Sequence, residues 1–350
     1  MGELKNKQHY IFQAYLKAWE NEDKKIWVYK KNDKKIFPAS TRDVLNKRRL
    51  YQLRNMNSDE KNFFELCMEV FKLNDESKAE MRNHIAAYLL PFSNQKLVNA
   101  LKKINPIPKD HELTPEIQNH FDELDRANEE AIVNTEEDFY SDYESDGEGW
   151  IRKILMQDLD FYYPSKIEAE EMIPSEKYAE RDDFINFLCI QYFRTCEMRD
   201  TMVKNISNML KLAESKKSLD VNSQNINPEN LLPHMIWILQ SNCAAALIHR
   251  NAHMTVLIND TALPFITSDQ PIINKESASD NDSPKEFVLY YPLSPTVAIT
   301  VNDRNRCKTK HIDKKSIVDD YNRKIIEHSY EYLVANKESV LQGIIEMENL

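Results

Sequence analysis

Hydrophobic positions recur at helical spacing along most of the chain and at strand spacing in two places. Spacings of three and four residues predict helices over 7–20, 58–101, 116–136, 149–163, 181–210, 231–252 and 313–336. Within the second of these, Pro91 is expected to end the helix 78–90. Alternation with a period of two predicts a β-hairpin over 24–40, with its turn at Asn32–Asp33. The same period predicts three or four strands between residues 254 and 303.

This order of elements predicts an α+β fold, mostly α-helical, with an N-terminal β-hairpin and a small antiparallel C-terminal sheet. The stretch 139–149 has few apolar residues apart from tyrosines, and it holds two of the four glycines, Gly147 and Gly149. It is therefore predicted to be a loop. We expect one unit over 1–350, with a sub-boundary near 139–149 that separates 1–138 (hairpin plus helices) from 150–350 (helices, sheet and terminal helix).

Composition excludes several classes of protein. The 350 residues are 41% hydrophobic and 29% charged, which is typical of a soluble globular chain. No apolar run approaches the ~20 residues of a membrane span, and the N-terminus has no apolar leader, so we expect a cytoplasmic protein without a membrane partner. The chain has only four glycines, and their positions match neither a glycine-rich phosphate-binding loop nor a GxSxG nucleophile elbow. Proteins that depend on either motif are therefore excluded. Five scattered cysteines predict reduced thiols: Cys67, Cys189, Cys196, Cys243 and Cys307.

Charge is unevenly distributed along the chain. The net charge is -11, yet residues 24–54 are strongly basic and residues 128–149 are strongly acidic. Two solvated faces are one interpretation. The alternative is a basic arm for nucleic acid, or an acidic segment that covers such an arm.

The segment QYFRTCEMR (191–199) carries polar groups on an apolar helix face. Gln191, Arg194 and Thr195 lie at helical spacing on the stripe that also holds Phe184 and Phe187. A buried arginine needs an anionic partner or several acceptors. Such a partner is either a carboxylate of the protein, for which Asp269 is the candidate, or a bound phosphate or substrate carboxylate.

The segment PFITSDQPII (264–273) places Thr267, Ser268 and Asp269 where a strand is predicted to end. Asp269 can accept backbone N–H groups in a turn, pair with Arg194, or act as a catalytic carboxylate. Ser268 as a nucleophile requires a neighbouring base such as His9 or His253.

A pair of histidines has the spacing of helical metal ligands. His249 and His253 are four residues apart, but no glutamate lies between them as in zinc proteases, and no third ligand is evident. No metal site is predicted, and the sequence names no cofactor.

Six segments together resemble a known family. QHYIFQAYLKAW, IWVYKK, QYFRTCEMR, FITSDQPI, YPLSP and YNRKIIEHSYEYLVAN occur in this order across nearly the whole chain. They are similar to the bacterial family of domain of unknown function 4238, some members of which are linked to antiphage defence. The resemblance implies catalytic roles for His9, Arg194 and Asp269, with His9 and Arg194 converging on Asp269. It implies substrate binding by Gln8, Gln191, Thr195, Arg199 and Ser268.

These residues suggest three functional hypotheses. The first is an antiphage protein that acts on nucleic acid or nucleotide as a nuclease. There His9 is the general acid and base, Arg194 and Arg199 hold phosphate, and Asp269 orients His9 or binds a metal. The second is a non-enzymatic sensor or interaction module that recognises a phage component. The third is a hydrolase of small substrates with Ser268 as nucleophile. The oligomeric state is left open by the sequence.

Overall fold

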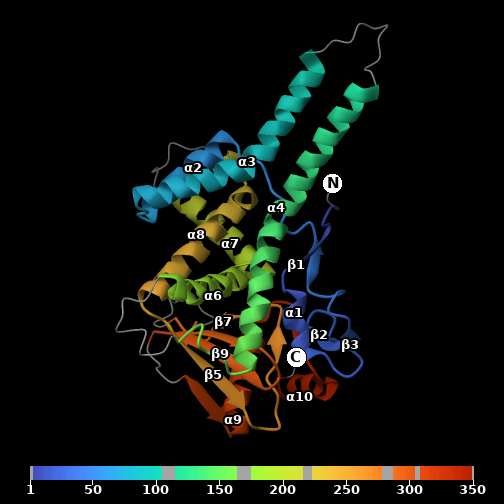
Figure 1. Cartoon of the computed structure of the whole chain (residues 1–350), viewed down its shortest axis with the longest axis vertical. Coiled ribbons are helices and arrows are strands. Elements are labelled where there is room, and N and C mark those ends of the chain that lie inside the picture. Colours follow the sequence, from blue (N-terminus) through green and yellow to red (C-terminus); the bar gives the residue numbers. More distant parts are fainter. Residues whose placement is uncertain are drawn as a thin grey trace. The chain divides into compact units, whose positions relative to one another are not determined.

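A computed structural model of the chain describes residues 3–104, 115–163, 175–215, 223–277, 287–303 and 308–348 (Figure 1). The chain forms two compact units. Unit 1 consists of residues 1–8, 47–141 and 200–238, and unit 2 consists of residues 9–46, 142–199 and 239–350. Three helices contribute residues to both units: α4 (Pro115–Leu155), α7 (Cys196–Ser215) and α8 (Pro228–His249). The short strands β1 (Lys7–His9) and β4 (Asn46–Arg48) pair with each other.

Unit 1 is mainly helical in its described part. Besides its shares of α4, α7 and α8 it holds α2 (Ser58–Val70), α3 (Asp75–Ile104) and the 3₁₀ turn η2 (Ser223–Asn225). In Figure 1, α3 and the first part of α4 lie side by side. Both Gln95 and Lys102 of α3 donate to the carboxylate of Asp125 in α4, at 2.9 and 2.6 Å. The prediction that Pro91 ends a helix is wrong, because α3 continues through Pro91 to Ile104.

The start of α2 is fixed by a reciprocal cap. The Asn57 side chain accepts the N–H of Glu60 at 2.9 Å, and the Glu60 carboxylate accepts the N–H of Asn57 at 2.7 Å. The other Glu60 oxygen accepts bonds from Asn227 and Asn230, at 3.0 and 2.9 Å, where α8 begins. Glu60 is only 1% exposed, so this one carboxylate ties two helices of unit 1 together.

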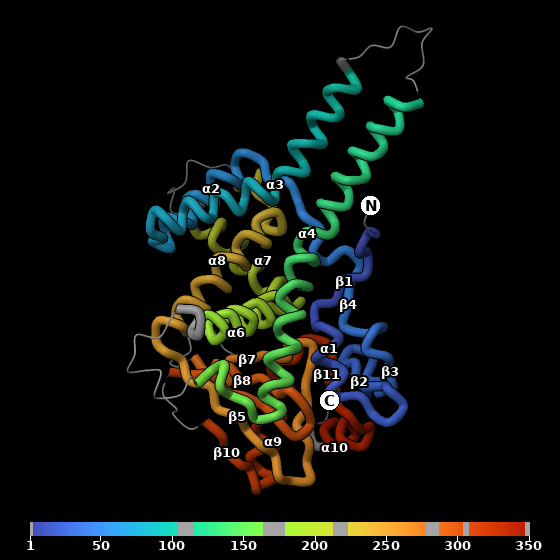
Figure 2. The backbone as a smooth tube through the Cα atoms, in the orientation of Figure 1, coloured from blue at the N-terminus to red at the C-terminus, as the bar shows by residue number. Residues whose placement is uncertain are grey.

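The four-stranded sheet of unit 2 joins the two ends of the sequence. Its order is β3 (Lys35–Ala39), β2 (Ile26–Lys30), β11 (Tyr332–Ala335) and β6 (Thr267–Ser268), and all pairs are antiparallel. Figure 2 shows β11 beside the β2–β3 hairpin. The predicted hairpin is confirmed. The prediction of helix over 313–336 is wrong at its end, since Tyr332–Ala335 pairs with β2 and β6 instead of continuing the helix.

The second sheet of unit 2 has five strands in the order β10 (Thr309–Ile312), β5 (His253–Asn259), β9 (Val297–Asn302), β8 (Leu289–Pro292) and β7 (Ile273–Asn274). The α+β class is confirmed, but this sheet is mixed, not antiparallel throughout, because β10 and β5 are parallel. Strand β9 runs antiparallel to β5, and β10 reverses direction after β9 and pairs with the other edge of β5.

Two predicted helices of unit 2 are interrupted. Its remaining helical elements are α1 (Gln13–Leu16), η1 (Lys17–Trp19), α6 (Ser175–Phe193), α9 (Lys315–His328) and α10 (Glu338–Glu348). The helix predicted over 7–20 begins instead as β1, because Lys7–His9 pairs with β4. The helix predicted over 181–210 is broken between α6 and α7 at Arg194 and Thr195, whose side chains bond to other segments.

The stretch 139–149 is helical and lies inside α4, so the predicted loop is wrong. The glycine that suggested a loop has a packing role, since a Cβ on Gly147 lies 2.2 Å from the Phe187 ring of α6. Glycine here lets two helices of unit 2 approach closely. The chain passes from unit 1 to unit 2 within this helix, between residues 141 and 142. The single-unit organisation and the sub-boundary near 139–149 stay predictions.

Gly147 and Gly149 provide a matched test of this packing. We expect Gly147→Ala to lower the free energy of unfolding by about 1–3 kcal/mol, because the Phe187 ring has to move. Gly149→Ala, with nothing within 4 Å of its added Cβ, is expected to raise stability by about 0.5–1 kcal/mol through helix propensity. Urea unfolding followed by circular dichroism measures both. Equal stability of the two variants contradicts the proposed contact.

Candidate functional site

Arg194 lies in the break between α6 and α7 and is 1% exposed. Its Nη1 forms an ion pair with Glu144 of α4, and its Nη2 donates to the backbone oxygen of His9 at the end of β1. The predicted ion pair between Arg194 and Asp269 is wrong, because Glu144 supplies the charge instead. Glu144 escaped sequence reasoning because it lies in the stretch that was predicted to be a loop.

The Asp269 carboxylate accepts three backbone N–H groups. Its Oδ1 bonds to Tyr330 N at 2.9 Å, and its Oδ2 bonds to Glu331 N and Tyr332 N at 2.6 and 3.0 Å. Asp269 is 1% exposed and closes the turn between α9 and β11. Of the three interpretations of its place in the sequence, acceptance of backbone N–H groups agrees with the structure, although the donors are 61 to 63 residues away. The predicted convergence of His9 and Arg194 on Asp269 is wrong, because the Asp269 oxygens accept these backbone N–H groups while Arg194 bonds to Glu144 and to the backbone oxygen of His9.

Lys31 acts on the same turn from the hairpin. Its Nζ donates to the carbonyl oxygens of Ile326 and Ser329, at 3.2 and 2.6 Å, at the end of α9. Cations are favourable at helix C-termini, where carbonyl groups lack helical donors. Lys31 and Asp269 therefore satisfy the acceptors and the donors of one turn.

Burial shifts the pKa values of the groups around this turn. It raises the pKa of Asp269 to about 6, against the opposing effects of three N–H groups and Lys31. Burial also lowers the pKa of Lys31 and raises the pKa of Tyr10, to which Cys196 and Asp269 contribute. A carboxyl group with a raised pKa suits acid–base catalysis, but both oxygens of Asp269 already serve the backbone. Its catalytic role stays a prediction.

Ser268 and Thr195 bond to Gln270 and its backbone. Ser268 Oγ donates to the carbonyl oxygen of Gln270 at 2.9 Å and accepts the Gln270 N–H at 3.1 Å. Thr195 Oγ1 donates to Gln270 Oε1, and Gln270 Nε2 donates to Ile272 O at 2.8 Å. Gln270 thereby links the helix break at Thr195 to the chain after β6. The Ser268 hydroxyl donates its proton to a carbonyl, which is a poor arrangement for a nucleophile.

The remaining predicted residues lie in different surroundings. Gln8 is part of unit 1, where it accepts Tyr51 N at 2.7 Å and donates to Val133 O at 2.8 Å. His9 is half-buried in unit 2, with Nε2 3.2 Å from the carbonyl oxygen of Arg42. Gln191 is 2% exposed, and its Nε2 has no hydrogen-bond partner within the described ranges. Arg199 is 7% exposed, and the N–H of its backbone bonds to Thr195 O at 3.0 Å.

The predicted spacing of His249 and His253 does not lead to a shared face. Helix α8 ends at His249, and His253 begins β5, where its Nδ1 lies 2.9 Å from the hydroxyl of Tyr163. No group of three or more histidine, cysteine, aspartate or glutamate residues is arranged for a metal ion in the described part of the chain.

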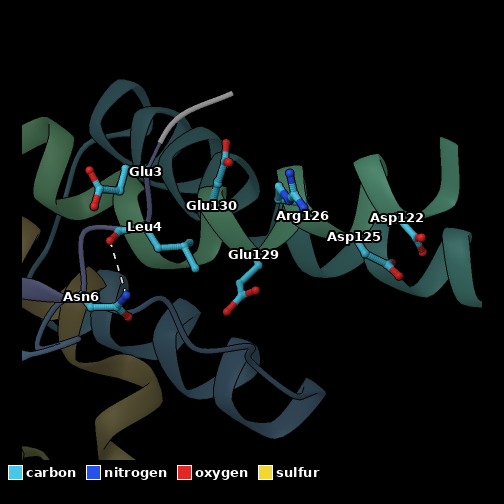
Figure 3. Close-up of a pocket in the computed structure, with 8 residues that line it drawn as sticks. All are labelled: Glu3, Leu4, Asn6, Asp122, Asp125, Arg126, Glu129 and Glu130. Atoms are coloured by element: carbon cyan, nitrogen blue, oxygen red, sulfur yellow. Dashed lines mark hydrogen bonds between the residues drawn. The ribbon is translucent and has the colours of Figure 1, made fainter. Parts of the chain in front are cut away.

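An acidic hollow lies in unit 1. It has a volume of about 590 Å³ and is lined by Glu3, Leu4, Asn6, Asp122, Asp125, Arg126, Glu129 and Glu130 (Figure 3). Five carboxylates against one arginine repel a phosphate backbone. The hollow contains none of the eight residues predicted to form the site.

Two histidines of unit 1, the half-buried His84 and the buried His234, were missed by sequence reasoning. The rings of His84 in α3 and His234 in α8 lie 5.6 Å apart, and His84 also stacks on Trp237 at 4.6 Å. One nitrogen of each ring, His84 Nε2 and His234 Nδ1, is buried without a hydrogen-bond partner among the described residues. Burial lowers the pKa of His84 to about 4 and that of His234 to about 3. Each histidine stands alone in its helix sequence, so no local motif marks the pair.

Acid should therefore destabilise unit 1. Both folded-state pKa values lie below the ordinary 6.5, so the unfolded chain takes up protons first as the pH falls below about 6.5. We expect each histidine to lower the free energy of unfolding by about 1.5 kcal/mol between pH 6.5 and pH 5. The double variant His84→Phe/His234→Phe keeps two rings and should flatten this dependence, measured by urea unfolding at each pH. The exposed His120→Phe is the control, and an unchanged slope in the double variant contradicts the assignment.

Helix α8 also has a membrane-like composition. Within the described residues it is the one helix long and apolar enough to cross a membrane, and 56% of its most apolar window is buried. The expected absence of a membrane partner stays a prediction.

Comparison with known proteins places the chain in a family. No curated protein and no solved structure matches it. The family model described as protein of unknown function (DUF4238) matches residues 7–339, which is nearly the whole chain and includes every predicted site residue. The chain therefore belongs to the DUF4238 family.

Proposed function

We propose that the protein is a bacterial antiphage defence protein that recognises nucleic acid through its β2–β3 hairpin. The observation that carries the proposal is the charge of residues 24–42, which hold seven lysine or arginine residues and one carboxylate in a chain of net charge -11. The antiphage element comes from the resemblance to defence-linked members of the same family. The protein is proposed to act in the cytoplasm.

The hairpin has cations available for phosphate. Lys24, Lys25, Lys34, Lys35 and Arg42 are exposed, whereas Lys31 is engaged with the end of α9. Lys30 pairs with Asp33 at 2.9 Å. Neutralising phosphates with exposed lysines releases counterions and supplies most of the affinity of non-specific nucleic-acid binding. This basic surface suits binding to a phosphate backbone better than the acidic hollow of unit 1 does.

The buried groups support recognition over cleavage. Arg194 is 1% exposed and is bonded to Glu144 and to the backbone oxygen of His9. A phosphate in solution therefore has little access to its guanidinium group. The Asp269 oxygens accept backbone N–H groups.

Cleavage at the hairpin is the second candidate, and one observation favours it. The half-buried imidazole of His9 lies against the carbonyl oxygen of Arg42, just beyond β3. A phosphodiester held by the hairpin cations near Arg42 would have a titratable group beside it, as general acid–base catalysis requires.

The test reverses the charge of the hairpin. A variant with Lys24, Lys25, Lys34 and Lys35 changed to Glu is compared with one carrying the same change at four exposed lysines of unit 1 helices: Lys61, Lys96, Lys103 and Lys211. Binding to single-stranded and duplex RNA and DNA is measured by fluorescence anisotropy over a salt series. We expect the hairpin variant alone to lose about tenfold or more in affinity and to reduce the slope of log K against log salt by up to about 3–4.

Phage plating at matched protein levels completes the test. The hairpin variant should lose protection, while the control variant and His9→Ala keep it. His9→Ala leaves the bond from Arg194 intact, since that bond is to the backbone. Loss of protection by His9→Ala with unchanged nucleic-acid binding supports the nuclease instead. Equal binding by the hairpin and control variants contradicts recognition through the hairpin.

A further inference from the structure

Arg181 of α6 is a buried cation of unit 2 with few partners, and it is 8% exposed. Its Nη2 donates to the backbone oxygen of Ala252 at 3.4 Å, which is long for a hydrogen bond. The same oxygen accepts a shorter bond, of 2.8 Å, from the hydroxyl of Tyr162. The guanidinium carbon of Arg181 also lies 5.4 Å from the centre of the Tyr162 ring, as a cation–π contact. Its Nε is buried without a hydrogen-bond partner in the described part of the chain.

The counter-charge that a buried arginine needs is missing at Arg181. Arg194, by comparison, is bonded to the Glu144 carboxylate and to the backbone oxygen of His9. No carboxylate of the described residues forms an ion pair with Arg181. The adjacent Asp182 is half-buried, and burial raises its pKa although the charge of Arg181 acts against that shift. Because burial of an unpaired charge is costly, an anion from outside the chain would complete this site.

A second cation lies beside the same aromatic side chains. The rings of Tyr162 and Tyr163 are 5.0 Å apart, and Lys308 Nζ lies 4.6 Å from the centre of the Tyr163 ring. Lys308 is exposed, and within the described ranges it takes part in no ion pair. The hydroxyl of Tyr163 lies 2.9 Å from Nδ1 of His253, at the start of β5. Arg181 and Lys308 therefore each lie against one ring of a tyrosine pair, and together they carry two positive charges.

We propose that Arg181 and Lys308 bind the phosphate group of a small ligand, either inorganic phosphate or a nucleotide. Two cations match a phosphate dianion better than a singly charged carboxylate. The planar guanidinium offers paired N–H donors to phosphate oxygens, and the lysine adds a point charge. Lys308 is exposed and Tyr163 is half-buried, so this side of the cluster is open to solvent. The site uses no residue of the β2–β3 hairpin, and the proposal is independent of nucleic-acid recognition there.

Removal of an unpaired buried cation should have an unusual effect on stability. In phosphate-free buffer we expect Arg181→Met to unfold at the same temperature as the wild type or at a higher one, because the chain does not neutralise the lost charge. Added inorganic phosphate should raise the unfolding temperature of the wild type more than that of Arg181→Met, since only the wild type binds it. The general stabilising effect of phosphate as an excluded salt is common to both proteins and cancels in the comparison.

Isothermal titration calorimetry on the full-length protein measures binding directly. The ligands are inorganic phosphate, adenosine monophosphate and adenosine, each in phosphate-free buffer. We expect one phosphate site per chain, a loss of affinity of about tenfold or more in Lys308→Ala, and no binding in Arg181→Met. The matched control is Lys310→Ala, because Lys310 is an exposed lysine two positions away in β10, and it should bind as the wild type does.

The ligand series distinguishes the two sources of the phosphate group. Tighter binding of adenosine monophosphate than of inorganic phosphate, without binding of adenosine, identifies a nucleotide. Equal or weaker binding of the nucleotide identifies phosphate itself. The proposal is overturned if the wild type binds neither phosphate nor the nucleotide, if adenosine binds as tightly as its monophosphate, or if Lys308→Ala binds like the wild type. None of these results depends on the folding of Arg181→Met, since Lys308 is exposed.

Discussion

The burial of a single positive charge constrains the fold of unit 2. The Arg194 guanidinium is almost completely removed from water, which costs several kcal/mol unless partners replace the solvent. Glu144 from α4 and the backbone oxygen of His9 from β1 supply that replacement. Three segments separated by up to 185 residues are therefore required to meet at one side chain. The break between α6 and α7 lies where this side chain and Thr195 are bonded.

Asp269 is likewise a buried ionisable group that needs partners, here an acid in place of a base. Its carboxylate is buried beside three N–H groups of the turn before β11, and Lys31 satisfies carbonyl groups of the same turn. That turn brings β11 between β2 and β6, so the N-terminal hairpin becomes part of a sheet with C-terminal strands. Polar residues that resemble an active site in sequence are thus engaged in holding distant segments together. This supports a function carried by the exposed face of the hairpin.

Local sequence patterns correctly predicted the helices and strands that are determined by residues close to them in the sequence. The hairpin, α2, α8 and most of α9 follow directly from apolar spacing and turn residues. Strand β11 was missed because its pairing with β2 depends on residues about 300 positions away. The helical character of 139–149 was missed because Gly147 and Gly149 suggested a loop, whereas Gly147 is explained by the Phe187 ring. For the candidate site, sequence reasoning identified Arg194 as a buried group that needs a partner and Asp269 as one candidate for that partner. The actual partners were missed because Glu144 and the backbone donors have no signature in the sequence.

The fold of unit 2 depends on the mutual stabilisation of Arg194 and Glu144. A double-mutant cycle tests it most directly, with unfolding free energies of the wild type, Arg194→Met, Glu144→Gln and the double variant. Because each single change leaves an uncompensated buried charge or acceptor, we expect a loss of about 3–5 kcal/mol for Arg194→Met. We also expect the double variant to be more stable than the sum of the two losses implies, by about 1–3 kcal/mol. Losses that add within about 0.5 kcal/mol would contradict the claim.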